Sequence, residues 1–166
     1  LLTFQRTVPY WDCGEFIATA ATMGVPHPPG APMFTLLGRI FTMLPFGDNP
    51  AIRMNFISVL SSSLTVMFLF LIITEILLLW KKELNSLGDK ILVYGSAAIG
   101  ALAYSFSDSF WFNAVEAEVY ATSMLFFSGV VWLGLKWFIL PDRPGLEKYI
   151  LLVAYLMGLS IGVHQL

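Results

Sequence analysis

Two acidic residues near the start of the sequence, Asp12 and Glu15, are spaced so that they share one face of a helix. One interpretation is a capping box, in which Asp12 caps the first turn and Glu15 reaches back to it. The other is a pair of carboxylates available for proton abstraction or metal binding. The two residues alone slightly favour the capping box, and both interpretations can hold because a cap fixes a carboxylate in position.

A second group of acids precedes an apolar run that begins at Val119, and it comprises Asp108, Glu116 and Glu118. The dipole of a following helix is enough to explain Glu116. Glu118 lies directly beside Val119, where burying a carboxylate is expensive unless it serves a function. No His and Cys spacing typical of metal sites is present, so the sequence assigns no metal ligands.

Other polar residues have structural explanations that compete with functional ones. The segment from His27 to Pro32 contains three prolines, which predict a stiff, non-helical hinge that either turns the chain or holds a site open. Arg39 and Arg53 could bind an anionic group, or they could extend along the membrane interface. For His164 we expect a satisfied interfacial histidine.

Composition places most of these residues in or near a membrane. Of 166 residues, 57% are hydrophobic and only 12% are charged, with a mean hydropathy of +0.76. This balance excludes a disordered chain and a nucleic-acid binder with a basic face, and the single cysteine, Cys13, excludes a disulfide scaffold. A net charge of −2 is too small to indicate a partner.

Long stretches with little or no charge predict an all-α, polytopic membrane protein. Spanning helices are expected at about 56–80, 91–107, 119–140 and 149–166. Lys and Arg divide unevenly between the two sides, with three in residues 1–55 and six in and around the 81–90 and 141–148 connections. The positive-inside rule then makes residues 1–55 an outer, extracytoplasmic loop.

We expect this outer loop to contain two short amphipathic helices, at 12–23 and 32–44. The second has an apolar stripe suited to the membrane interface, formed by Met33, Leu36, Leu37, Ile40, Phe41 and Leu44. Its other face comprises Thr35, Gly38, Arg39 and Thr42.

Four motifs in order along the chain resemble a known family of multi-spanning proteins. They are Trp-Asp-Cys-Gly-Glu-Phe at 11–16, His-Pro-Pro-Gly-Ala-Pro at 27–32, Leu-Leu-Gly-Arg at 36–39 and Ala-Glu-Val-Tyr-Ala at 117–121. They resemble the protein O-mannosyltransferase-like family of Bacteroidetes and animals, a group of GT-C type glycosyltransferases. The resemblance implies a GT-C-like helical bundle and an N-terminal fragment of a longer enzyme. The sequence departs at one point from the protein O-mannosyltransferases, which it also resembles: two residues separate Asp12 from Glu15, whereas those enzymes have adjacent acids.

The resemblance also implies a reaction, a location and roles for residues. A sugar, mannose, would move from a polyprenyl-phosphate donor to a Ser or Thr hydroxyl of a secreted or membrane protein. No nucleic-acid partner is expected, and a divalent metal is a possible cofactor. The location implied is the inner membrane of a bacterium, or the endoplasmic reticulum membrane of a eukaryote, with the active site outside the cytoplasm. Asp12 would be the catalytic base, and Glu15 would orient the acceptor or exchange roles with it. The implied substrate-binding residues are His27, Arg39, Asp108 and Glu118.

Two other functions remain open at this point. A transporter would use intramembrane acids as an ion path, although such acids favour the middle of the bilayer and these gather at one interface. A non-catalytic assembly subunit would tolerate substitution of Asp12 and Glu15.

Overall fold

The computed structural model describes residues 3, 5–140 and 144–164, and within them every regular element is a helix. The elements are α1 (Cys13–Thr22), α2 (Pro32–Thr42), α3 (Pro50–Lys81), α4 (Leu87–Lys90), η1 (Ile91–Gly95), α5 (Ser96–Ser105), α6 (Asp108–Ala114), α7 (Val119–Ile139) and α8 (Glu147–Ile161). The predicted all-α class is therefore confirmed for the part of the chain described.

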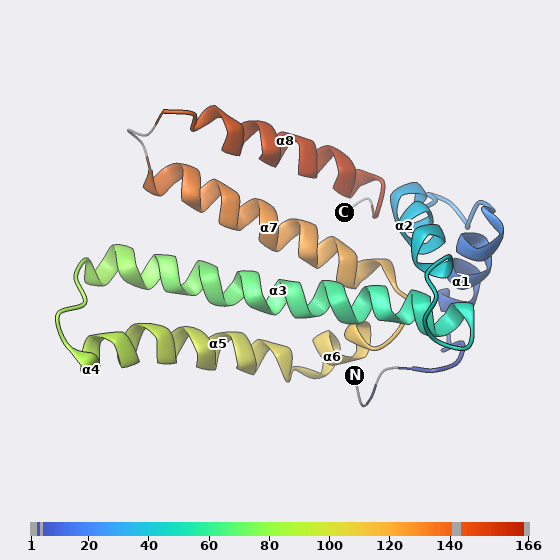
Figure 1. Cartoon of the computed structure of the whole chain (residues 1–166), viewed down its shortest axis with the longest axis horizontal. Helices are drawn as coiled ribbons and strands as arrows, with labels where there is room; N and C mark the ends of the chain where they lie inside the picture. The colour runs from blue at the N-terminus through green and yellow to red at the C-terminus, as the bar shows by residue number, and fades with distance from the viewer. Residues whose placement is uncertain (1–2, 4, 141–143, 165–166) are drawn as a thin grey trace.

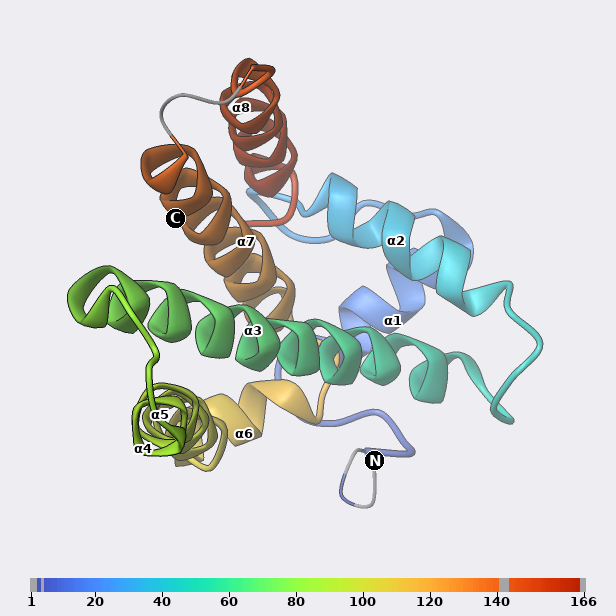
Figure 2. The same cartoon turned by 60° about the vertical axis from the view of Figure 1, so that its left-hand side comes forward.

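Long helices lie side by side, and short helices gather at one end of them (Figure 1). α3 contacts α5 and α7 along its length, and α8 packs against α7. The N-terminal half of α3 also contacts α1 and α2, which cover that end of the molecule (Figure 2). The start of α7 lies at the same end, close to α6.

Two helices, α3 and α7, are long and apolar enough to cross a bilayer. α3 begins at Pro50, before the predicted position 56, because Asn49 caps it by accepting a hydrogen bond from the Ile52 N–H at 3.0 Å. Pro in the first turn suits this start, since its missing N–H needs no partner there.

The other two predicted spans are helical but do not meet the same test. Residues 91–107 fall largely within a continuous helical run made of α4, a π-helical turn (η1) and α5. α8 has 15 residues, and residues 165–166 of the predicted span 149–166 lie outside the described part.

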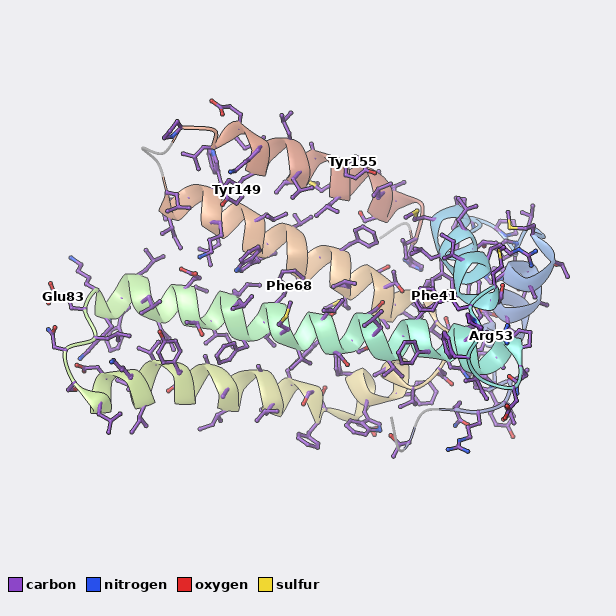
Figure 3. All side chains as sticks on the ribbon, viewed as in Figure 1. Phe41, Arg53, Phe68, Glu83, Tyr149 and Tyr155 are labelled. Carbon is purple, nitrogen blue, oxygen red and sulfur yellow. The ribbon has the colours of Figure 1, made fainter. Side chains whose placement is uncertain are left out.

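Polar and small residues join the long helices. The hydroxyls of Ser61 on α3 and Thr122 on α7 lie 3.4 Å apart, and Lys136 on α7 pairs with Glu75 on α3. A Cβ added at Gly100 would lie 3.1 Å from Ile73 Cδ1, so the glycine allows α5 to approach α3 closely. Figure 3 shows the side chains along this bundle, with Arg53 at the α1–α2 end and Glu83 at the opposite end.

The orientation of α2 differs from the prediction on one face. Thr35 and Gly38, expected on the exposed polar face, are buried together with Phe34 against α1 and α3. A Cβ at Gly38 would lie 2.5 Å from Met54 Sδ and 2.7 Å from Ala20 Cβ, so only glycine permits this contact. The outward side still presents Leu36 and Ile40, which are half or more exposed and suit a membrane interface.

Candidate active site

The candidate site begins at Asp12, immediately before α1. Asp12 occupies the N-cap position, but its side chain makes no capping hydrogen bond, and 54% of the side chain is exposed. Glu15 does not reach back to it either. The capping-box interpretation is therefore wrong, because Glu15 has a different partner and the Asp12 carboxylate remains available.

The partner of Glu15 is His27, at the start of the proline hinge. One carboxylate oxygen, Oε1, accepts the backbone N–H of His27 at 2.7 Å, and Oε2 lies 2.7 Å from the ring Nδ1. Hydrogen bonding to His27 lowers the pKa of Glu15. The same bond raises the pKa of His27 against the opposing effect of desolvation.

The hinge presents His27 in a fixed orientation. The Gly30 N–H donates to the His27 carbonyl at 2.8 Å, closing a turn in which Gly30 has a φ of +76°. Glycine adopts such a positive φ at little cost. The His27 ring also lies 6.0 Å from the Phe16 ring, centroid to centroid, so α1 contacts the hinge beside the Glu15 carboxylate.

The second ring nitrogen of His27 faces Asp12. Nε2 lies 3.8 Å from Asp12 Oδ2. Asp12, Glu15 and His27 can each offer one ligand atom such that the three atoms lie within 4.8 Å of one another. The sequence spacing of these residues does not reveal this grouping, because the hinge conformation creates it.

Glu118 approaches the same place from the start of α7. It is only 7% exposed, and its Oε1 accepts a hydrogen bond from the buried Cys13 thiol at 3.3 Å. Burial raises the pKa of Glu118 and outweighs the lowering effect of the thiol bond, with a smaller raising effect from Asp12. Burial and the neighbouring Glu118 also raise the pKa of Cys13, so the thiol keeps its proton and donates.

A small cavity of about 60 Å³ brings these groups together. Its polar lining includes Asp12 and His27 from the first loop, Glu118 and Tyr120 from the start of α7, and His164 after α8. A cavity needs about 10–15 Å³ to hold one water, so this one has room for several waters or for an ion with a few waters. Three regions far apart in sequence therefore share one polar cavity at the α1–α2 end of the bundle.

Two acids lie outside this lining. Glu116 is 5% exposed, and burial together with the negative charge of Glu118 raises its pKa. Asp108 is exposed in the first turn of α6 and does not line the cavity. Of the second acidic group, the structure thus brings only Glu118 to the cavity.

The two arginines considered for anion binding, Arg39 and Arg53, donate hydrogen bonds to backbone carbonyls instead. Arg39 donates to the Ala21 carbonyl at 2.6 Å. Arg53 donates to the carbonyls of Phe46 at 2.6 Å, Thr42 at 2.5 Å and Gly47 at 3.2 Å. These bonds tie α2 to α1 and the 43–49 loop to α3, and neither arginine lines the cavity.

The sequence analysis missed two features of the site. Nothing in the sequence marks Cys13 as the partner of Glu118, 105 positions away. His164 was expected to be satisfied, but its buried Nδ1 has no hydrogen-bond partner among the described residues. A Met33 N–H bond to the Gly162 carbonyl at 2.7 Å holds the segment before His164 against α2.

Chemically, the arrangement combines an accessible carboxylate with an oriented imidazole and a buried acid. Asp12 is the carboxylate free to accept a proton, since Glu15 has both oxygens bonded to His27. The pKa of Glu118 is raised and that of Glu15 is lowered, so Glu118 keeps its proton to a higher pH than Glu15 does. Groups whose pKa values move apart in this way are typical of acid–base sites.

Comparison with known proteins agrees with the motifs. Residues 12–166 match the family model described as the protein O-mannosyl-transferase TMEM260 N-terminal domain. The protein O-mannosyl-transferase TMEM260 of Mus musculus is 31% identical over 164 residues, which cover 96% of this chain and 21% of the mouse protein. The Dictyostelium discoideum protein O-mannosyl-transferase tmem260 is 29% identical over 135 residues, 80% of this chain and 15% of that protein.

The chain thus spans about a fifth of the length of these curated relatives, or less. No solved structure matches it significantly. The family match extends from Asp12 through Glu118 to the end of the chain, so it includes every residue of the cavity. The chain belongs to the family of the protein O-mannosyl-transferase TMEM260 N-terminal domain.

Proposed function

We propose that this chain forms the first outer loop and first membrane helices of a GT-C type glycosyltransferase. The enzyme transfers a sugar, mannose, from a polyprenyl-phosphate donor to a Ser or Thr hydroxyl of a protein. The two relatives from Mus musculus and Dictyostelium discoideum are both protein O-mannosyl-transferases by name, which supports the sugar and the protein acceptor.

One observation carries the proposal: the carboxylate of Asp12, which makes no capping bond to α1, lines a cavity that His27 and Glu118 also line. A sugar on a lipid phosphate already has a good leaving group. The acceptor hydroxyl is the weak partner, and it needs a base within hydrogen-bond reach. Asp12 is that base in our proposal, and its 54% exposed side chain can meet an incoming protein acceptor.

The other acids have supporting roles in the same proposal. Glu15 is a positioning residue, because both of its oxygens hold His27 in place. Glu118 binds a hydroxyl of the sugar or of the acceptor, since a buried carboxyl group with a raised pKa can donate as well as accept a hydrogen bond.

The distribution of charge supports an outer location for the cavity. Residues 1–55 contain three basic residues, whereas six lie in and around the 81–90 and 141–148 connections: Lys81, Lys82, Lys90, Lys136, Arg143 and Lys148. We propose that the α1–α2 end faces the extracytoplasmic side and that the protein is multi-pass, in a bacterial inner membrane or in the endoplasmic reticulum.

A transporter fits the described residues less well. Glu75 is the only acid within α3 and α7, and it is paired with Lys136 instead of standing free on an ion path. An assembly subunit would have no need for a base that is free of hydrogen bonds beside a buried acid. The assembly subunit predicts that Asp12 and Glu15 can be changed without loss of function.

The test is a transfer assay on the purified full-length protein. It should release mannose from a labelled polyprenyl-phosphate-mannose donor when a protein acceptor is present, and the label should appear on Ser or Thr. Parallel donors with glucose or N-acetylglucosamine test the sugar. Absence of transfer from every donor, in a folded preparation with acceptor, would contradict the proposed function.

A further inference from the structure

We propose that Asp12 and His27 bind a divalent cation, with Glu15 as the positioning residue that holds the imidazole. The binding site itself stands on the geometry of these residues. The role that we give the cation in catalysis rests on the proposed function.

The separation of two candidate ligand atoms suits a bridging ion. Bonds from a divalent metal such as zinc to imidazole nitrogen and carboxylate oxygen are about 2.0–2.2 Å long. Two ligands of one ion can therefore be at most about 4.3 Å apart. Asp12 Oδ2 and His27 Nε2 are 3.8 Å apart, which is too long for a hydrogen bond and within reach of a shared cation.

Glu15 lies on the far side of the imidazole, where a supporting carboxylate is expected. Its Oε2 is 2.7 Å from Nδ1, so a proton on Nδ1 leaves the Nε2 lone pair directed toward Asp12. A carboxylate that fixes the tautomer and orientation of a ligating histidine in this way is a general feature of metal sites. The backbone bond from the His27 N–H to Oε1 prevents Glu15 from turning away.

Two further groups in the cavity point to a cationic ligand. Glu118 lines the same cavity, is only 7% exposed, and has no basic side chain paired with it among residues 3, 5–140 and 144–164. The buried Nδ1 of His164, another lining residue, has no hydrogen-bond partner within that part of the chain. A buried carboxylate without a cation and an orphaned imidazole nitrogen are both costly unless a ligand compensates them.

The charge of the cavity gives the cation a function. The described lining residues include two carboxylates and neither Lys nor Arg, and the nearby Arg39 and Arg53 are bonded to carbonyls. A lipid phosphate approaching the Asp12 carboxylate would be repelled unless a positive charge intervenes. A cation on Asp12 Oδ2 would offset that repulsion while the second oxygen of Asp12 remains for the acceptor hydroxyl. Mixed nitrogen and carboxylate ligands suit Mn²⁺ or Zn²⁺.

Mn²⁺ binding to the full-length protein tests the site directly, without donor or acceptor. The protein is stripped of metal with a chelator and titrated with Mn²⁺, and free Mn²⁺ is measured by electron paramagnetic resonance.

Electron spin echo spectra of the bound ion should show coupling to an imidazole ¹⁴N. His27→Gln should abolish that coupling, and Asp12→Asn should weaken Mn²⁺ affinity at least about tenfold. Loss of the supporting carboxylate in Glu15→Gln should weaken affinity by about 10–100-fold.

Glu83→Gln is the matched control, because Glu83 is an exposed acid at the opposite end of the bundle (Figure 3). It should leave affinity and ¹⁴N coupling unchanged. Should His27→Gln fail to fold, Asp12→Asn decides, since the Asp12 side chain makes no capping bond that folding would lose. No saturable Mn²⁺ binding, or binding with unchanged affinity in folded Asp12→Asn, would overturn the site. A protein that binds Mn²⁺ at these residues and transfers no sugar would contradict only the proposed function.

Discussion

The carboxylate of Glu15 binds His27 through both of its oxygens, one at the backbone N–H and one at the ring Nδ1, each at 2.7 Å. The first turn of α1 thereby holds the first residue of the proline hinge across twelve positions of sequence. Glu15 therefore makes no capping bond with Asp12, so one acid positions the hinge and the other lines the cavity.

The Glu15–His27 pair predicts a defined pH dependence in metal-free protein. The pKa of His27 is raised above its ordinary 6.5, so its stabilisation is complete below 6.5 and disappears as pH rises through the folded-state pKa. The pKa of Glu15 is lowered below 4.5, so its part is complete above 4.5 and disappears as pH falls through the folded-state pKa. The pair should therefore stabilise the hinge fully between about pH 4.5 and 6.5.

Nuclear magnetic resonance of ¹³C-histidine-labelled protein measures this titration. The His27 signal should titrate above 6.5 in the natural sequence and return toward 6.5 in Glu15→Gln. A His27 pKa that is the same in both proteins would show that the contact does not persist in solution.

Close packing of α2 predicts a sharp effect of a single methyl group. Gly38→Ala should destabilise the protein by about 1–3 kcal/mol, because the new Cβ would lie within 2.7 Å of Met54 and Ala20. Alanine favours a helix by up to about 1 kcal/mol, which offsets only part of this cost. Thermal unfolding in detergent should show a melting temperature lower by a few degrees.

Gly88→Ala in α4 is the matched control for the Gly38 variant. Its Cβ would have only an ordinary contact at 3.5 Å with Ser86, so the melting temperature should stay the same or rise slightly. Equal losses at both positions would indicate that close packing of α2 is not the cause.

The helices could be predicted from sequence because their signals are local. Long uncharged runs identify α3 and α7, and the prolines and glycines mark the ends of α1 and α2. The uncharged run begins only at Phe56, so it misses the first turns of α3, which contain Arg53. The Arg53 guanidinium donates to three carbonyls of the segment before α3, and these contacts between α3 and the loop cannot be recognised from the run of apolar residues.

The packing of α2 and the make-up of the cavity could not be predicted, because both depend on contacts distant in sequence. An apolar stripe does not reveal whether a helix turns it toward lipid or toward other helices, and Gly38 decides this by allowing α3 to approach. The Glu15 partner depends on the hinge conformation. The Cys13–Glu118 bond joins residues 105 positions apart, and no local rule predicts such a pair.

The orientation in the membrane can be tested by cysteine labelling at two exposed positions. Asp48→Cys, in the loop before α3, should react with a membrane-impermeant maleimide from outside intact cells. Asn85→Cys, between α3 and α4, should react only after permeabilisation. Cys13 is fully buried and adds no background from this chain, and Thr35 is unsuitable because it is buried against the core. The reverse labelling pattern would place the cavity on the cytoplasmic side.

Substitution of Asp12 tests its role as the catalytic base. Asp12→Asn keeps the size of the side chain and removes the basic oxygen, and positioned general bases contribute about 10²–10⁴-fold to rate. We expect transfer to fall by about that factor, with membrane insertion unchanged, because the Asp12 side chain makes no capping hydrogen bond to α1. Glu15→Gln should cause a smaller loss, since an amide can still bond to His27 through its oxygen.

Asp48→Asn is the matched control, an exposed acid of the same outer loop that lies outside the cavity. It should transfer sugar at the natural rate.

The pH profile of transfer distinguishes a catalytic base from a residue that only shapes the cavity. Loss of Asp12 should remove the acidic limb of the profile, because that limb reports protonation of the base. If folded Asp12→Asn retains full transfer with the same acidic limb, Asp12 is not the base, and Glu118 becomes the remaining carboxylate that lines the cavity.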